Sequence, residues 1–387
     1  MLKINDIHYF DYAATTFICQ PALEAYNYFQ NNICVMWGKG NNKLSSLSKK
    51  AFDRAMQYIF RHFGVSQTEY GMIFGKNTTE IINVIAYSIE HMVMPSDIVL
   101  IGPYEHHSNY LPWKYMARRR NAIFIEMPLD ANGNIDIDYL KAISSGVKVV
   151  AYSSASNTNG FTLNKQKINS LFKDSTLIFT DESQWIAHAP LELSSKASGY
   201  VLSSHKMYGP KNIAGAFIKR SLIDNMCPLI LGGGMIETQQ YDDNWAGNEF
   251  KFYAGTYDVG LVMGWGKACE YIDNISYDAI KKQEEEWYNE ILNFLKSYPD
   301  VTVHSTEFSV HSLISFTHSR IHPHDIESFL AQNNVIIRSG NMCAQSALKK
   351  MERNAINRIS FGVGISDEDI KILRSSLKSC FYKLGRN

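Results

Sequence analysis

The chain has 387 residues, of which 45% are hydrophobic, so it is long enough to bury a sizeable core in one or two domains. Lys+Arg and Asp+Glu each total 38, and this balance gives no electrostatic reason to expect a nucleic-acid or membrane partner. The N-terminus lacks a signal-like apolar run, and no stretch is long enough to span a bilayer. The six cysteines are scattered without a CxxC pair, which is typical of reduced thiols, so we expect a cytoplasmic protein.

The predicted elements of the first two thirds of the chain are typical of an α/β protein. Apolar residues recur at helical spacing over residues 44–63. Short apolar runs then alternate with helical patterns, and the predicted strands are 71–74, 98–102, 122–126, 147–152, 176–180 and 199–202. This alternation predicts a mostly parallel sheet covered by helices, in which ligands bind at the carboxyl ends of the strands.

The pattern changes after about residue 262, where we predict a smaller α+β domain. A helical stretch over 262–293 precedes predicted strands at 301–304 and 313–317, a helix from Asp325, a strand at 335–338 and a final helix. Ser366 and Asp369 are spaced to cap that last helix. We therefore divide the chain into a large domain, residues 13–262, and a small domain, residues 263–387, with residues 1–12 packing on the small one. One face of the final helix is lined by Ile370, Leu373, Leu377 and Phe381.

Two predicted strands end in residues of complementary chemistry. Asp181 ends the strand at 176–180, with Gln184 three residues later, and Lys206 follows the strand at 199–202. An acid and a lysine at the ends of two strands can converge on one small ring. Pyridoxal phosphate (PLP) needs a lysine for its Schiff base and a carboxylate for its pyridinium nitrogen. The two strand ends therefore predict a PLP site.

Weaker signals stand after three other predicted strands. Thr78 and Thr79 open a helix whose N-terminus is suited to a phosphate, although an ordinary threonine cap explains the same residues. His106 follows the strand at 98–102 and could stack on a planar cofactor, although a lone histidine is more often structural. Asn157 follows the strand at 147–152, where it offers an amide to a ligand or simply forms a turn.

A group of histidines between residues 304 and 324 has none of the spacings of a metal site. These histidines alternate with predicted strand residues and flank Pro323, without an HExxH motif or Cys/His ligand pairs. We interpret them as surface and strand residues and expect no bound metal. The group consists of His304, His311, His318, His322 and His324.

The motifs in their order along the chain resemble the class V aminotransferase family, whose best-known members are the cysteine desulfurases and selenocysteine lyases. A single match would be weak, but the ordered set is specific and covers nearly the whole chain. The resemblance implies PLP fold type I, with a mostly parallel sheet of the seven-stranded type. The matching segments are FDYAATT (10–16), NTTEIIN (77–83), EHHSNYLPW (105–113), SN (156–157), DESQ (181–184), SSHKMYGP (203–210), AGT (254–256) and RSGNMCA (338–344).

The resemblance also implies a role for individual residues. Lys206 would hold PLP in a Schiff base and move protons, and Asp181 would pair with the pyridinium nitrogen. Gln184 would contact the phenolic oxygen, and His106 would stack on the ring. Asn157 and Arg358 would bind the carboxylate of the amino acid substrate. The residues expected elsewhere on the cofactor, mainly at its phosphate, are Thr78, Thr79, Ser203 and His205, with Thr256 contributed by the neighbouring subunit of a homodimer with shared active sites.

Cys343 differs from the other five cysteines in its setting. It follows a polar, glycine-containing loop at 338–341, which could be mobile and close to the cofactor. The resemblance implies that Lys206 removes the α-proton of cysteine and that Cys343 then attacks the substrate sulfur. A persulfide would remain on Cys343, and alanine would leave. Two histidines commonly precede this cysteine in the similar branch of the family, whereas Asn341 and Met342 stand there in this chain.

We therefore interpret the chain as a PLP-dependent cysteine desulfurase that passes the persulfide of Cys343 to an acceptor, which can be a protein. A selenocysteine lyase is a close alternative. In another class V reaction, such as a transaminase, epimerase or C–S lyase, Cys343 would be incidental. A non-catalytic relay scaffold is the alternative of a different class, and the presence of Lys206, Asp181 and Gln184 argues against it.

Overall fold

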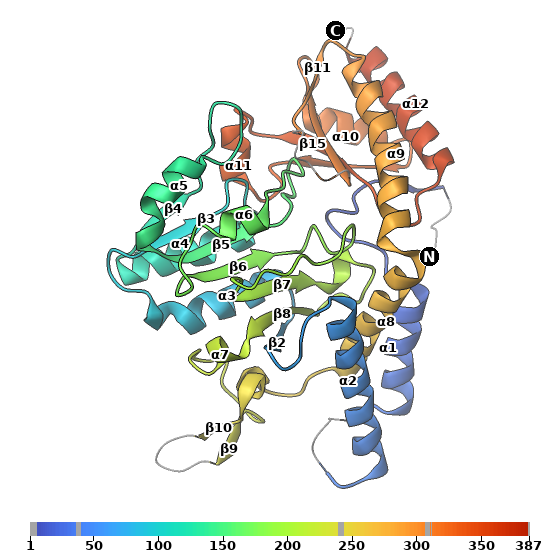
Figure 1. Ribbon diagram of the computed structural model, residues 1–387. Helices are drawn as coiled ribbons and strands as arrows, with labels where there is room; N and C mark the ends of the chain where they lie inside the picture. Colours follow the sequence, from blue (N-terminus) through green and yellow to red (C-terminus); the bar gives the residue numbers. More distant parts are fainter. Residues whose placement is uncertain (1–5, 36–39, 239–243, 306–309, 311, 386–387) are drawn as a thin grey trace.

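The computed structural model describes residues 6–35, 40–238, 244–305, 310 and 312–385 (Figure 1). Two larger β-sheets organise this part of the chain, one above the other in Figure 1. The helices that surround them are α1 (Gln20–Asn32), α2 (Lys43–His62), α3 (Thr78–Ile89), α4 (His107–Arg120), α5 (Ile137–Ile143), α6 (Lys165–Asn169), α7 (Arg220–Ile223), α8 (Val259–Ile275), α9 (Tyr277–Lys296), α10 (Pro323–Ala331), α11 (Gln345–Lys350) and α12 (Asp367–Leu384).

The larger sheet has seven strands within the described residues, in the order β2-β8-β7-β6-β5-β3-β4. The strands from β7 to β4 are parallel to their neighbours, and β8 alone runs antiparallel to β2 and β7. This confirms the predicted α/β fold with a mostly parallel sheet. The strands are β2 (Tyr70–Gly75), β3 (Ile98–Ile101), β4 (Ile123–Glu126), β5 (Val147–Ser153), β6 (Leu177–Asp181), β7 (Gly199–Ser203) and β8 (Ala214–Lys219).

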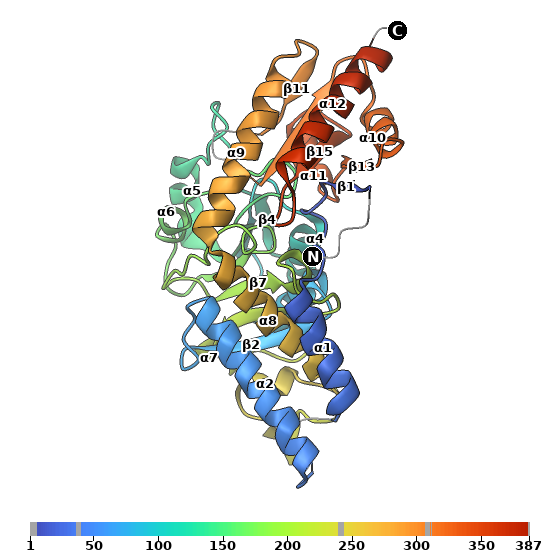
Figure 2. The ribbon, with the colours of Figure 1, turned by 90° about the vertical axis from the view of Figure 1, so that its right-hand side faces the viewer.

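Helices cover the larger sheet because most of its strands are continuous buried runs, which need apolar cover on both faces. Helix α3 packs on β2, β7 and β8, and α4 packs on β3, β4 and β5. The long helices α1 and α2 run alongside α8, and Figure 2 shows this group from the side. No helix in the described ranges has the length and apolar composition that crossing a membrane requires.

The smaller sheet is antiparallel, with the order β11-β12-β15-β14 in the described part of the chain. Its core includes Trp287 of α9, Leu330 of α10 and Leu373 of α12. The N-terminal strand β1 (His8–Tyr9) pairs in parallel with β13 (Val335–Ile336) beside this sheet. The two-domain division at residue 262 remains a prediction. The strands of the smaller sheet are β11 (Val301–Val303), β12 (Leu313–His318), β14 (Arg338–Gly340) and β15 (Ile356–Ser360).

Two predicted elements of the C-terminal part are divided in the structure. The helical stretch predicted over 262–293 is two helices, because Ser276 takes φ 73° and ψ 142° and interrupts the hydrogen bonding between α8 and α9. The strand predicted at 335–338 is also split, since β13 pairs with β1 whereas β14 pairs with β15. The predicted cap of the final helix is confirmed, as Ser366 and Asp369 form a capping box at the start of α12.

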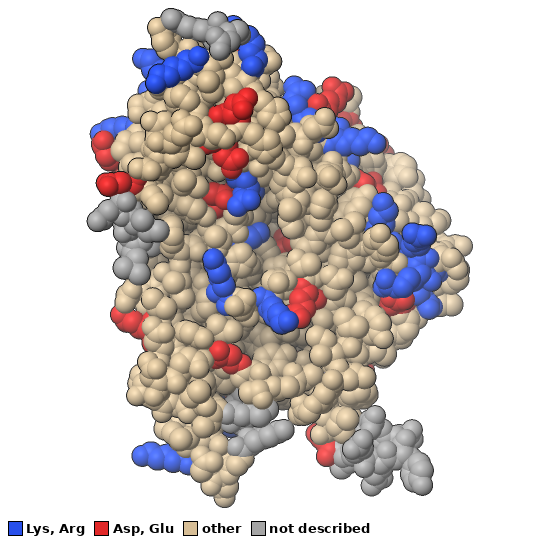
Figure 3. All heavy atoms as spheres, turned by 180° about the vertical axis from the view of Figure 1, so that it is seen from behind, with Lys and Arg blue, Asp and Glu red and all other residues tan. Residues whose placement is uncertain are grey.

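The surface carries no large field of one sign on the face shown in Figure 3. Lysine and arginine side chains lie interspersed with aspartate and glutamate, and the middle of this face is hollowed.

The three consecutive arginines at 118–120 form the last turn of α4, where positive charge interacts favourably with the helix dipole. Arg119 pairs there with Glu90.

Candidate active site

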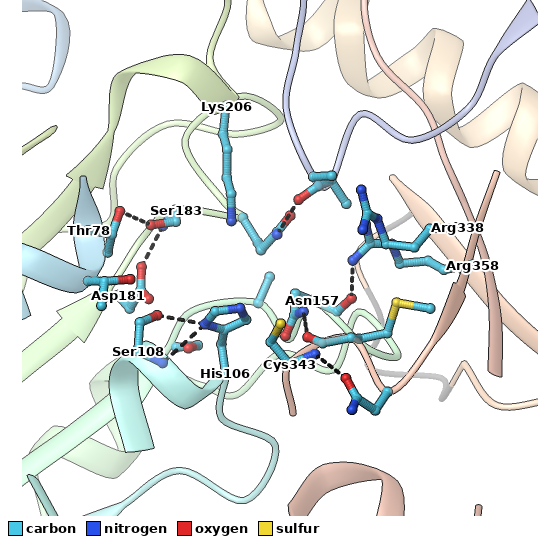
Figure 4. Close-up of a pocket in the computed structure, with 18 of the residues that line it drawn as sticks. Thr78, His106, Ser108, Asn157, Asp181, Ser183, Lys206, Arg338, Cys343 and Arg358 are labelled. Atoms are coloured by element: carbon cyan, nitrogen blue, oxygen red, sulfur yellow. Dashed lines mark hydrogen bonds between the residues drawn. The ribbon is translucent and has the colours of Figure 1, made fainter. Parts of the chain in front are cut away.

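A cavity of about 560 Å³ lies between the carboxyl ends of the larger sheet and the loop that carries Cys343 (Figure 4). Its lining brings together most of the residues predicted from the sequence. Ser203 and Thr256 are the two predicted residues that do not line it. Those that do are Thr78, Thr79, His106, Asn157, Asp181, Gln184, His205, Lys206, Cys343 and Arg358.

Lys206 and Asp181 come from neighbouring parallel strands. Asp181 is the last residue of β6, and Lys206 lies in a short 3₁₀ turn directly after β7. Burial lowers the pKa of Lys206 to about 8, although the charge of Asp181 opposes this shift. Burial also raises the pKa of Asp181, against the opposing effects of a hydrogen bond from Ser183 and the charge of Lys206. The cavity therefore holds an amine that is deprotonated far more readily than a surface lysine.

His106 is held as a neutral ring at the start of α4. It is the N-cap residue, and its Nδ1 accepts the backbone N–H of Ser108 at 3.1 Å, so the ring hydrogen belongs on Nε2. Burial, together with the nearby charge of Lys206, lowers the pKa of His106 to about 3. A neutral imidazole face can stack on a cationic heterocycle without charge repulsion, and Figure 4 shows this ring at the edge of the cavity.

The N-terminus of α3 supplies polar groups at one end of the cavity. Asn77 caps this helix, and the hydroxyl of Thr78 lies 3.1 Å from that of Ser183. His205 contacts Thr15 through Nδ1 at 3.0 Å, and burial lowers its pKa to about 4. Ser203 is buried, and its hydroxyl has no hydrogen-bond partner among the described residues. Free N–H groups at the start of α3, beside the hydroxyls of Thr78 and Thr79, fit a phosphate at this end of the cavity.

Arg358 lies on β15 of the smaller sheet and is only 2% exposed, so it is not a surface charge at a strand end. One terminal nitrogen pairs with Asp11 at 2.8 Å, and the other donates to the backbone oxygen of Asn157 at 2.8 Å. Within the described part of the chain, the Nε of Arg358 and the Oδ1 of Asn157 are buried without a partner. A buried cation with an unused donor at a cavity is suited to a carboxylate ligand.

Cys343 is exposed at the cavity, on the loop between β14 and α11. Met342 and Cys343 have φ values of 53° and 52°, which L residues rarely adopt. The backbone N–H of Cys343 donates to Asn341 Oδ1 at 3.0 Å, and its carbonyl accepts the N–H of His107 at 2.7 Å. The thiol therefore stands on a loop that is bonded to the residues beside His106.

The sequence matches a family with many known members. The family model for class-V aminotransferases matches residues 8–373. The chain belongs to the class-V aminotransferase family. A probable cysteine desulfurase of Pyrococcus abyssi is 28% identical over 96% of both chains, and one of Halalkalibacterium halodurans is 30% identical over 96% of this chain and 92% of its own.

Solved structures of class-V enzymes superpose on nearly the whole chain. The apo cysteine desulfurase from Thermococcus onnurineus NA1 gives a TM-score of 0.91 at 26% identity, covering 97% of this chain and 94% of that one. The cysteine desulfurase CsdA of Escherichia coli gives 0.90 at 22% identity, over 98% and 96% of the two chains, and shares the fold. The predicted family and fold are thereby confirmed.

Several residues to which the sequence analysis gave no role line the cavity or lie beside it. Asp11 and Arg338 stood inside matching motifs, and they form an ion pair at 2.7 Å beside Arg358. Ser183 stood inside the DESQ motif, and its N–H donates to Asp181 at 2.9 Å. His324 also lines the cavity, with Nδ1 2.6 Å from the hydroxyl of Ser339. No local sequence pattern indicated that His324 lines the cavity. It lies on α10, and only the tertiary fold brings this helix close to the other site residues.

The remaining predicted positions lie away from the cavity. Thr256 lines a second cavity of about 280 Å³, together with Lys76 and Tyr257. His304 contacts Thr317, and His322 caps α10. His311 lies outside the described residues, and no group of three or more metal-binding side chains occurs within the described ranges.

Proposed function

We propose that this class-V enzyme is a PLP-dependent cysteine desulfurase, which converts L-cysteine to alanine and leaves the sulfur as a persulfide on Cys343. One observation carries the proposal: a single cavity is lined by the amine of Lys206, the carboxylate of Asp181 and the thiol of Cys343. The names of the relatives support the same activity.

The residues present fit PLP. Lys206 supplies the amine for covalent attachment, Asp181 supplies the carboxylate for the ring nitrogen, and the start of α3 supplies phosphate-binding groups. When bound, PLP supplies an electron sink for bond breaking next to the amino group of the substrate. Asp181 would favour this chemistry by keeping the ring nitrogen protonated. The buried carboxylate and the positively charged nitrogen would stabilise each other.

The cysteine substrate is oriented by residues of the smaller sheet and by the amine. Arg358 and Asn157 bind its carboxylate, using the Nε donor that lacks a partner within the described residues. Lys206, with a pKa of about 8, can take the α-proton as a free amine and return it to carbon. Gln184 donates one N–H of its amide nitrogen to the backbone oxygen of Ala13 at 2.7 Å, and its second N–H can donate to the ring oxygen of PLP.

Sulfur transfer to Cys343 needs no external oxidant. The thiolate of Cys343 attacks the substrate sulfur, a sulfur–sulfur bond forms, and the bond between that sulfur and the substrate carbon breaks. Two thiols become one persulfide, and the second thiol proton ends on the methyl carbon of alanine. The exposed position of Cys343 then allows an acceptor, which can be a protein, to collect the sulfur.

We further propose a homodimer with shared active sites in the cytoplasm. Thr256 lies outside the main cavity of its own chain, and the family resemblance assigns it to a cofactor phosphate, which is then that of a second subunit. The six cysteines are free thiols, which fits a reducing compartment. Sedimentation velocity tests the dimer: we expect a species of twice the mass of the chain, and a monomer that is active alone would contradict it.

The decisive test is Cys343→Ser in the PLP-loaded protein. Wild-type protein fed with L-cysteine should release alanine and carry a persulfide on Cys343, detected by mass spectrometry. The variant should keep its cofactor colour and lose both products. Cys34→Ser, which alters another exposed thiol, is the matched control. Unchanged alanine formation in Cys343→Ser removes the thiol from the reaction, and pyruvate in place of alanine indicates a C–S lyase.

A further inference from the structure

Glu126 is a point of convergence at the edge of the larger sheet. It is the last residue of β4, and its carboxylate accepts from the hydroxyl of Tyr110 at 2.8 Å and from that of Ser346 at 2.8 Å. The ammonium of Lys350 lies 2.6 Å away. Burial alone would raise the pKa of Glu126, but the hydrogen bonds and the charge of Lys350 outweigh it and hold the pKa below its usual range. The carboxylate is therefore ionised and bound by three donors.

Two of those donors belong to α11, the short helix that starts two residues after Cys343. Ser346 and Lys350 lie one turn apart on this helix, so a single carboxylate fixes both its first and its last turn. Lys350 also donates to the backbone oxygen of Pro103, just after β3, at 2.6 Å. Helix α11 is thus attached to the ends of two strands of the larger sheet.

The loop in front of α11 is held from the same side. The N–H of His107 donates to the carbonyl of Cys343 at 2.7 Å, and the N–H of Gln345 donates to His107 Nε2 at 3.3 Å. The side chain of Asn157 donates to the carbonyl of Met342 at 2.8 Å. Each of these three bonds requires the loop to stay docked, because both partner residues, His107 and Asn157, belong to the side of the larger sheet.

The backbone at Cys343 needs this support. Met342 and Cys343 both stand in the left-handed region, with φ of 53° and 52°. Non-glycine residues persist there only when their surroundings enforce it. Neither Asn341 nor Met342 carries a charge that could anchor the thiol. Among the described residues, the first ion pair after Cys343 along the chain is the one between Lys350 and Glu126, in which both side chains are partly buried.

We propose that Glu126 is a positioning residue for Cys343: its ion pair with Lys350 and its bond to Ser346 dock α11 on the larger sheet and so hold the thiol at the cavity. The proposal rests on the proposed role of Cys343 as the sulfur acceptor within the enzyme. We therefore expect Glu126 to affect sulfur transfer but not cofactor binding, because Glu126 does not line the cavity.

The test is Glu126→Gln in the PLP-loaded protein, which keeps the size of the side chain and removes its charge. Hydrogen exchange of residues 344–351 should become faster by about tenfold, because a charge-assisted contact that closes the segment is lost. The kcat for alanine formation should fall roughly 10- to 100-fold, since a displacement of about 1 Å can cost that much. The KM for cysteine and the visible spectrum of the cofactor should stay as in the wild type.

Two further variants keep the test decisive. Lys350→Met should reproduce both effects, and the double variant should lose less than the sum of the two single losses, because the two residues share one ion pair. Glu368→Gln removes an exposed ion pair with Lys371 and should change neither readout. Exchange equal to that of Glu368→Gln, or faster exchange with an unchanged kcat, overturns the proposal. If the wild-type protein forms no alanine from cysteine, the proposed function is wrong. The hydrogen exchange of residues 344–351 still measures how firmly α11 is docked on the larger sheet.

Discussion

At the scale of single residues, burial lowers the pKa of two basic side chains in the cavity, Lys206 and His106. A lysine with a pKa of about 8 is neutral in about one molecule in ten at pH 7, whereas an ordinary lysine is almost entirely charged. The same burial keeps His106 neutral. Both shifts arise before any cofactor is bound, because they follow from the enclosure of Lys206 and His106 between the sheet and the Cys343 loop.

The pKa of Lys206 predicts how the apoprotein takes up PLP. Only the neutral amine reacts with the aldehyde, and Lys206 is mostly protonated below its pKa of about 8. The rate of covalent uptake should therefore rise with pH up to about 8 and then level off, which absorbance can follow. Lys206→Ala should yield no adduct that borohydride can fix. A rate that keeps rising toward 10.5, the ordinary lysine value, would contradict the shift.

The ion pair between Asp11 and Arg358 is a second residue-scale prediction. Both side chains are almost fully buried, at 7% and 2% exposure, so removing the carboxylate leaves an uncompensated buried cation. Asp11→Ala should cost about 3–5 kcal/mol of unfolding free energy, measured with urea on the apoprotein. Asp53→Ala, in an exposed pair with Lys49, should cost far less. Equal decreases in unfolding free energy for the two variants would mean that the buried ion pair stabilises the protein no more than the exposed one.

The site residues divide into those that a local pattern reveals and those that it does not. Asp181 and Lys206 were predicted because each directly follows an apolar strand, and parallel strands end at one edge. The role of Asp11 was missed, since its partner Arg358 lies 347 positions away and nothing near either residue indicates the pairing. Ser183 was missed for a simpler reason: a serine that donates its backbone N–H looks like any turn residue.

At the scale of elements, continuous apolar runs predicted strands correctly, whereas helical periodicity did not reveal the interruption between α8 and α9 at Ser276. The predicted strands of the larger sheet lie within two residues of the observed ones, because all of them except the partly exposed edge strand β4 consist mostly of buried residues. Apolar residues such as Ile272 and Ile280 continue the helical pattern on either side of Ser276. Periodicity reports which side chains are buried, and it carries no information about the backbone angles of one intervening serine.

Ser276 provides the prediction at this scale. Its φ of 73° and ψ of 142° are angles that glycine adopts most easily, while its hydroxyl accepts the N–H of Ala279 at the start of α9. Ser276→Gly should stabilise the protein by about 1 kcal/mol, because relief of the backbone strain exceeds the loss of the cap. Ser276→Ala keeps the strain and loses the cap, so it should destabilise by about 1 kcal/mol. Urea unfolding that ranks the two variants in the opposite order would refute this account.

At the scale of the whole molecule, neither sheet makes the site alone. Lys206 and Asp181 follow strands of the larger sheet, whereas Arg358 lies on the smaller one and Cys343 follows its edge strand. His188, after β6, also bonds Glu284 of α9 at 2.8 Å, so the contact between the two parts of the chain includes a nearly buried pair. A ligand in the cavity therefore contributes to the stability of both parts.

Cofactor binding should accordingly raise the unfolding temperature of the whole chain. At about 100 times its Kd, PLP should stabilise the wild-type protein by about 2.7 kcal/mol, with a single shifted transition in calorimetry. Lys206→Ala should show a smaller shift, because it lacks the covalent attachment. Two separate transitions, of which only one responds to PLP, would show that the larger sheet binds the cofactor independently of the smaller one.

The pairing of Asp11 with Arg358 has a consequence for how the protein is made. On the ribosome, residues 8–11 emerge long before the strands β13 and β15 that receive them. Phe10, which is fully buried among residues 287–381, cannot reach its native environment until those residues have been synthesised. The part of the cavity lined by Arg358 is thus completed only when two segments 347 positions apart in the chain come together.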